Sequence, residues 1–71
     1  MWSLCAVRGD EPPIAERVRR QGTAYRRART LYAASYAITA VQYTAGEAPD
    51  PVAVYRFDGI RFARIPKLEL P

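Results

Sequence analysis

The chain has 71 residues, of which 49% are hydrophobic and 25% are charged, and its formal net charge is +4. A chain of this length predicts one domain, residues 1–71, with a small core. The single cysteine excludes an intrachain disulfide, and the absence of histidine excludes histidine-based catalytic triads and zinc sites built on Cys and His.

The N-terminal part of the chain predicts two elements joined by a turn. Residues 1–8 carry few charges on either parity and predict a strand, in which we expect Cys5 to be a small buried residue. Residues 9–13, Gly-Asp-Glu-Pro-Pro, are a turn signal. Residues 14–20 fit either a helix, by residue propensity, or a second strand. A turn that directly follows a strand favours a hairpin, so we predict a strand.

Residues 23–35 predict the main helix, with Thr23 as its N-cap. Small and apolar residues recur there at helical spacing and predict an inner stripe. The stripe consists of Ala24, Ala28, Leu31, Tyr32 and Ser35. Among the tyrosines, we expect Tyr32 to lie in the core and Tyr25 at the surface.

The C-terminal half predicts three further strands. Residues 36–45 are rich in β-branched and aromatic side chains and predict a strand. A loop follows at 46–51. In residues 52–65, Asp58-Gly59 separates two alternating runs and predicts a hairpin. The last residues, 66–71, are expected to form an extended tail over the core.

Two registers of this hairpin are compatible with the sequence. A two-residue turn places Arg56 directly opposite Arg61, whereas a three-residue turn with a glycine bulge pairs Val54 with Phe62. Only the first of these extends a basic surface across the hairpin.

The element order is therefore β-β-α-β-β-β, which is typical of an α+β fold. It predicts a small antiparallel sheet covered on one face by a single helix. The other face is expected to be open or covered by a second copy. If residues 14–20 are helical, the order becomes β-α-α-β-β-β, or β-α-β-β-β if the two helices merge.

The charge of the chain is concentrated between residues 17 and 29. This block holds six arginines and no acid, whereas the rest of the chain has five bases and seven acids. This block is either a solvated helix face or a binding face. The high density of arginines within it favours binding to an acidic partner. Tyrosine and arginine are also enriched at protein interfaces. The residues predicted to bind the partner are Arg17, Arg19, Tyr25, Arg26, Arg27, Arg29, Arg56 and Arg61.

The sequence offers little for catalysis. The acids are scattered, the four glycines are isolated, and the serines and Cys5 lack a histidine partner. We therefore predict no enzymatic activity, no cofactor and no metal. The chain has no apolar run long enough for a membrane span and no signal-peptide pattern, so we expect a cytoplasmic protein.

Two segments resemble small phage-encoded anti-CRISPR proteins in their layout. The helix begins Ala24-Tyr25-Arg26-Arg27-Ala28, and the final hairpin reads Tyr55-Arg56-Phe57-Asp58-Gly59-Ile60-Arg61-Phe62. The resemblance covers residues 22–65. It implies a non-catalytic inhibitor, acting in the cytoplasm of the host cell, that docks on the CRISPR surveillance complex and blocks access of DNA.

These observations favour a small interaction protein, and the resemblance implies that a phage or mobile element encodes it. Its expected partner is an acidic protein or ribonucleoprotein surface. Two alternatives stay open: a nucleic-acid-binding module that contacts phosphates, and a structural subunit of a larger assembly such as a homo-oligomer.

Overall fold

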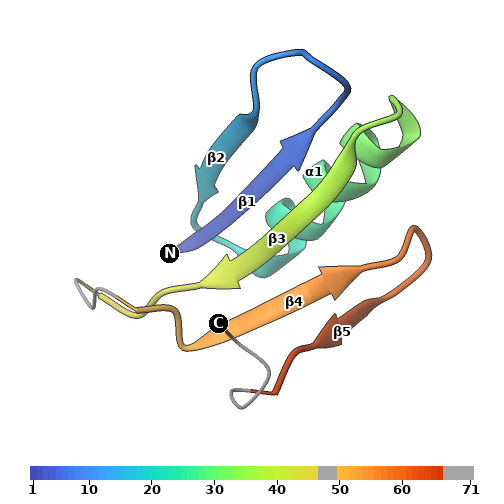
Figure 1. Ribbon diagram of the computed structural model, residues 1–71. Coiled ribbons are helices and arrows are strands. Elements are labelled where there is room, and N and C mark those ends of the chain that lie inside the picture. Colours follow the sequence, from blue (N-terminus) through green and yellow to red (C-terminus); the bar gives the residue numbers. More distant parts are fainter. Residues whose placement is uncertain (47–49, 67–71) are drawn as a thin grey trace.

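A single helix packs on one face of an antiparallel sheet. The computed structural model describes residues 1–46 and 50–66. Its elements are β1 (Trp2–Val7), β2 (Ile14–Val18), α1 (Gln21–Ala33), β3 (Ala37–Tyr43), β4 (Ala53–Phe57) and β5 (Phe62–Arg64). The sheet order is β2-β1-β3-β4-β5, with every neighbouring pair antiparallel. Figure 1 views the sheet from the side opposite α1.

The predicted α+β fold is confirmed, including a strand rather than a helix after the first turn. Within the described part of the chain, no helix is long and apolar enough to cross a membrane. The predicted extended tail is not assessed, since residues 67–71 lie outside the described part.

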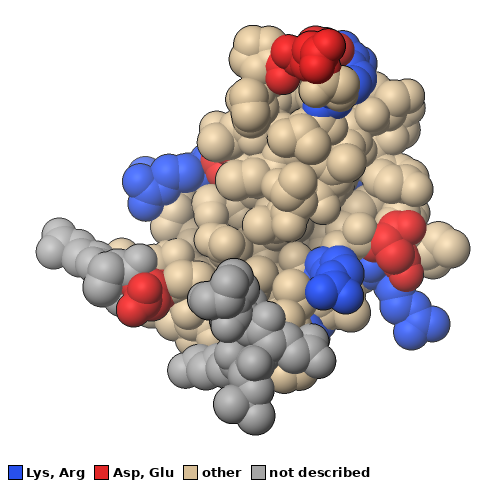
Figure 2. Space-filling view, in the orientation of Figure 1, with Lys and Arg blue, Asp and Glu red and all other residues tan. Residues whose placement is uncertain are grey.

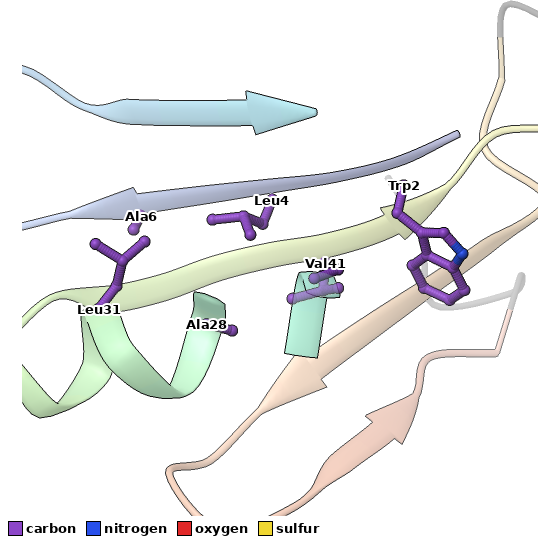
Figure 3. Close-up of a cluster of buried hydrophobic side chains, with 7 residues drawn as sticks. Trp2, Leu4, Ala6, Ala28, Leu31 and Val41 are labelled. Carbon is purple, nitrogen blue, oxygen red and sulfur yellow. The ribbon is translucent and has the colours of Figure 1, made fainter. Parts of the chain in front are cut away.

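The core forms where alternate residues of β1 and β3 meet three small or apolar residues of α1. Leu4 and Val41 are neighbours across the β1–β3 ladder, and they are 1% and 0% exposed. The complete buried cluster is Trp2, Leu4, Ala6, Ala24, Ala28, Leu31 and Val41 (Figure 3). Because alanine has the smallest apolar side chain, Ala24 and Ala28 let α1 lie close to the sheet.

Aromatic rings extend the core towards β4 and β5. Trp2 contacts Tyr43 and Tyr55, with ring centroids 5.2 and 5.7 Å apart. Tyr25 of α1 stacks on Phe62 of β5 with a centroid distance of 3.7 Å. Such ring contacts add specific geometry to the burial of apolar area, so they fix the helix above the C-terminal strands.

The start and the inner stripe of the helix differ from the prediction. Arg20, not Thr23, is the N-cap residue. Tyr32 is 47% exposed, whereas Tyr25 is half-buried, so the expected order of these two tyrosines is wrong. Both rings lie on the β5 side of the helix. Tyr25 reaches the aromatic cluster over the sheet, while Tyr32 packs on Phe57 at the end of β4 and against Gly59 in the turn that follows.

Ser35 was expected in the inner stripe but lies beyond the end of the helix. Its φ of 73° is left-handed. The Tyr36 N–H donates to the Leu31 carbonyl and the Ser35 N–H to the Tyr32 carbonyl, each at 3.0 Å. These two bonds form a Schellman motif, in which the residue after the C-cap must turn left-handed. Ser35 therefore ends the helix instead of facing the sheet.

Cys5 is exposed, so the expectation of a buried thiol is wrong. In β1, Trp2, Leu4 and Ala6 face the helix and are buried. Cys5 points to the opposite side of the sheet because successive strand side chains alternate. No element of the described chain covers that side as α1 covers the other.

The final hairpin adopts neither predicted register. Phe57 pairs with Phe62, and Arg56 pairs with Ala63, so four residues form the turn. The Asp58 carboxylate accepts hydrogen bonds from the Ile60 and Arg61 N–H groups at 2.8 and 2.9 Å. These bonds tighten the longer turn, and Arg56 does not lie opposite Arg61.

Gly59 makes this turn possible. Its φ is 99°, and a Cβ there would lie 2.6 Å from the Tyr32 ring. The turn therefore needs glycine both for its backbone conformation and for the close approach of Tyr32.

Candidate functional site

Helix α1 begins without the usual compensation for its positive end. Arg20 has extended backbone angles of −119° and 144° and makes no side-chain capping hydrogen bond, and the first turn contains no acid. The free N–H groups and the helix dipole make this end partly positive. Arg19 and Arg20 add two cations beside it.

Two further arginines lie on the exposed side of the helix. Arg26 and Arg29 are one turn apart, and both are exposed. The Arg29 guanidinium lies over the Phe62 ring, 5.1 Å from its centroid, which orients this side chain towards β5. We call Arg19, Arg20, Arg26 and Arg29 the helix arginines.

None of the helix arginines forms an ion pair with an acid of the described chain. The ion pairs found among the described residues are Arg8–Glu11 and Arg27–Glu16. Four like charges near one helix repel each other unless an acidic group from elsewhere lies against them. This surface therefore has unused capacity to bind anions.

Arg27 differs from its neighbours because its charge is balanced within the fold. Its Nε donates to Glu16 Oε1 at 3.0 Å and its Nη2 to Glu16 Oε2 at 2.8 Å. These hydrogen bonds hold the pKa of Glu16 below its ordinary value. The forked contact ties α1 to β2, so Arg27 has a structural partner already.

The other predicted arginines lie away from the helix arginines. Arg17 is next to Ser3 across the β1–β2 ladder, on the sheet face opposite α1. Arg56 lies on that same face, opposite Ala63. Arg61 belongs to the β4–β5 turn. The structure thus brings Arg26 and Arg29 together and separates Arg17 and Arg56 from them by the thickness of the sheet.

Tyr25 borders the helix arginines but is partly used in packing. Its ring stacks on Phe62, and its hydroxyl accepts a hydrogen bond from Gln21 Nε2 at 3.0 Å. The ring edge thus forms an apolar margin between the helix and β5.

Arg8 was not singled out from the sequence. Its Nη1 donates to the Ala34 carbonyl at 2.9 Å, and its guanidinium lies 4.4 Å from the Tyr36 ring centroid. Its hydrogen bonds to Glu11 lower the pKa of that carboxylate. Arg8 thereby joins the β1–β2 turn to the negative end of α1. The Arg-x-x-Glu spacing was the sequence signal for the pair Arg8–Glu11.

The described residues contain no group of three or more His, Cys, Asp or Glu side chains that could hold a metal ion. Comparison of the chain with protein-family models, with curated proteins and with solved structures finds no match. The interpretation of the surface therefore depends on its own geometry and charge.

Proposed function

We propose that this protein is a non-enzymatic interaction protein that binds an acidic partner through the helix arginines. The observation that carries the proposal is the placement of cations at an uncapped helix N-terminus with no acid in the first turn. This arrangement destabilises the isolated helix, because cations oppose the dipole there. It becomes favourable when carboxylates or phosphates of a partner lie against the same end.

An acidic protein or ribonucleoprotein surface is the preferred partner. Tyr25 and Phe62 adjoin Arg29, and a mixture of aromatic and arginine side chains is typical of protein interfaces. Inhibition of a CRISPR surveillance complex is the concrete form suggested by the resemblance of residues 22–65. A plasmid-interference assay with co-expressed protein tests that form directly.

Charge reversal tests the binding surface. The variant Arg26→Glu/Arg29→Glu should bind a fluorescent Asp/Glu-rich peptide at least tenfold more weakly than the wild type, which is about 1.4 kcal/mol. The matched control Arg56→Glu/Arg61→Glu has the same change in net charge on the sheet and turn, and it should bind within a factor of about three. Equal losses in both variants would show that only net charge matters and would contradict the proposal.

The salt dependence of binding separates the two partner classes. A module that contacts phosphates should bind a short DNA duplex with an affinity that falls by roughly one log–log unit per phosphate contacted. The proposal expects tighter binding to the acidic peptide than to the duplex at physiological salt. The opposite ranking, with a steep salt slope, would favour the nucleic-acid alternative.

A further inference from the structure

Strand β2 forms one edge of the sheet. It comes first in the order β2-β1-β3-β4-β5, so β1 is its partner among the described strands and its other side is free. Figure 1 shows no element of the described chain on that outer side. The opposite edge strand, β5, has three residues, whereas β2 has five. The free edge of β2 is therefore the longer one on which a further strand can pair.

The ladder between β1 and β3 shows which backbone groups of β2 point outward. Met1 and Thr44 exchange two backbone hydrogen bonds of 2.8 and 2.9 Å, so they form a hydrogen-bonded pair. Such pairs alternate along an antiparallel ladder, so the next residue, Trp2, directs its N–H and C=O groups to β2. The residues of β2 opposite Trp2 and its alternate neighbours therefore bond to β1. The two residues between them, Ala15 and Arg17, direct their N–H and C=O groups to the free edge.

The helix side of this edge is apolar and incompletely covered. Ile14 and Val18 pack against the core, yet both are only half-buried. Between them lies Glu16, whose charge is balanced by the forked contact with Arg27. An added strand would lie about 4.8 Å away, so its alternate side chains would cover the two apolar residues. That burial is favourable and leaves no unpaired charge behind.

The other side of the same edge is basic. Arg17 lies there beside Ala15, and it is exposed and forms no ion pair with an acid of the described chain. Figure 2 shows Lys and Arg atoms that project at the margin where Figure 1 places β2. Charged side chains on an edge strand oppose pairing with a second copy of the same strand. Carboxylates placed across from Arg17 would instead stabilise the pairing.

We propose that an extended segment of the acidic partner pairs with β2 as an additional antiparallel strand. This inference rests on the proposed function for the acidic character of the partner, and it adds the backbone conformation in which part of that partner is held. Antiparallel pairing matches every other pair of the sheet. Residues directly opposite each other share a face, so the segment carries Asp or Glu on the side of Arg17 and apolar residues on the side of Ile14 and Val18. Main-chain hydrogen bonds provide affinity, and the alternation of side chains provides specificity.

Two peptides of the same composition test the alternation. Each has about eight residues, enough to span β2; one alternates Glu and Val, and the other repeats Glu-Glu-Val-Val. Fluorescence anisotropy should show at least tenfold tighter binding of the alternating peptide. A ratio near one, or no measurable binding of the alternating peptide, would overturn the proposal.

The helix-arginine variant separates this inference from the proposed function. Arg26→Glu/Arg29→Glu should weaken the binding of both peptides by the same factor and leave their ratio unchanged. If the variant kept the wild-type affinity for both peptides and the ratio persisted, the proposed function would be contradicted and strand addition supported. If the ratio were near one while both affinities fell, strand addition would be overturned and the proposed function supported.

N-methylation of the peptide identifies the paired amides without any change in the protein. In antiparallel addition the N–H groups that bond to β2 belong to the Glu positions, because directly opposite residues exchange both bonds. Methylation of these nitrogens should lower the affinity at least tenfold, whereas methylation of the Val nitrogens should lower it less than about threefold. Equal losses, or a larger loss at the Val positions, would contradict antiparallel addition.

Substitution of Ala15 changes the protein side of the same hydrogen bonds. Ala15→Pro removes an N–H group that points to the free edge, a position at which a strand tolerates proline. This variant should bind the alternating peptide at least tenfold more weakly. The control Ala15→Val keeps the N–H group and should bind like the wild type. Equal affinities of the two variants would contradict the proposal.

Amide hydrogen exchange of the wild type gives a readout that needs no substitution. The N–H groups of Ala15 and Arg17 should exchange rapidly in the free protein and slowly at saturating alternating peptide. The N–H group of Glu16 bonds to β1 and should exchange slowly in both states. Unchanged exchange at Ala15 and Arg17 in the complex would overturn the proposal.

Discussion

Ser35 ends the helix in a conformation that suits glycine better than serine. Its φ of 73° lies in the left-handed region, where the Cβ of an L-residue is crowded. The residue is kept there because the Schellman hydrogen bonds and the contact of Arg8 with the Ala34 carbonyl fix the chain on both sides. A single position thus carries strain that neighbouring contacts offset.

Replacement of this serine by glycine should stabilise the protein. Ser35→Gly removes the crowding but increases the entropy of the unfolded chain, so we expect a net gain of about 0.5–1 kcal/mol. This corresponds to a rise in Tm of a few degrees, roughly 4–8 °C per kcal/mol for a domain of this size. Thermal unfolding followed by circular dichroism measures it. Ser35→Ala is the control and should give no gain; a lower Tm for Ser35→Gly would show that the serine is not strained.

At the scale of elements, α1 has unequal ends. Its C-terminus is closed by the Schellman motif and by Arg8, whereas its N-terminus has neither a capping side chain nor an acid. Local preferences are often violated where a surface serves binding. Substitutions at the uncapped N-terminus of α1 should therefore change the stability of the fold and the binding of the acidic partner in opposite directions.

The substitution Arg20→Asp tests this opposition. Aspartate is a preferred N-cap residue, and the backbone angles of residue 20 suit a cap. We expect a gain of about 1 kcal/mol in the free energy of unfolding. Urea titration measures the gain, and peptide binding should weaken in the same variant. The control Arg19→Asp makes the same charge change outside the cap position. It should stabilise less, and equal stabilisation would mean that only charge is involved.

At the scale of the whole molecule, alternation and turn residues were enough to predict the fold. Gly9-Asp10-Glu11-Pro12-Pro13 after a strand-like run with few charges on either parity indicated the first hairpin, and the β-branched run before residue 45 indicated β3. These preferences are set by residues that are neighbours in the sequence, so the folded chain keeps the elements that they predict. That the sheet has one helical layer on one face was inferred from the prediction of a single helix.

Apart from the helix ends and the Asp58 turn, where local hydrogen bonds decided the outcome, the errors concern contacts between distant parts of the chain. Cys5 was expected to be buried because both parities of β1 lack charge, but alternation does not tell which side a helix covers. The turn at Asp58 packs against Tyr32, which is far away in sequence and leaves no room for a side chain at Gly59. Likewise, Arg17 and Arg26 are close in sequence but lie on opposite sides of the sheet. Charge density along a chain therefore predicted a basic surface without predicting its shape.

The carboxylates connect the surface charges to the stability of the whole molecule. The pKa values of Glu11 and Glu16 are lowered chiefly by hydrogen bonds from Arg8 and Arg27, and the pKa of Asp58 by the turn N–H groups. A group with a lowered folded-state pKa stabilises the fold at pH values above its unfolded pKa. That contribution is lost as the pH falls through the folded-state pKa.

Stability should therefore be nearly constant at neutral pH and fall below the ordinary carboxylate pKa values of 4.5 and 3.8. Glu16 should contribute most among these groups, because it is the half-buried one and joins β2 to α1. Urea titrations from pH 7 to pH 2 measure this dependence. Glu16→Gln should be less stable at pH 7 and should lose less stability on acidification than the wild type. The control Asp50→Asn removes an exposed carboxylate and should keep the wild-type profile. If the two variants gave the same profile, the acid sensitivity would arise from net charge and not from the contact between α1 and β2.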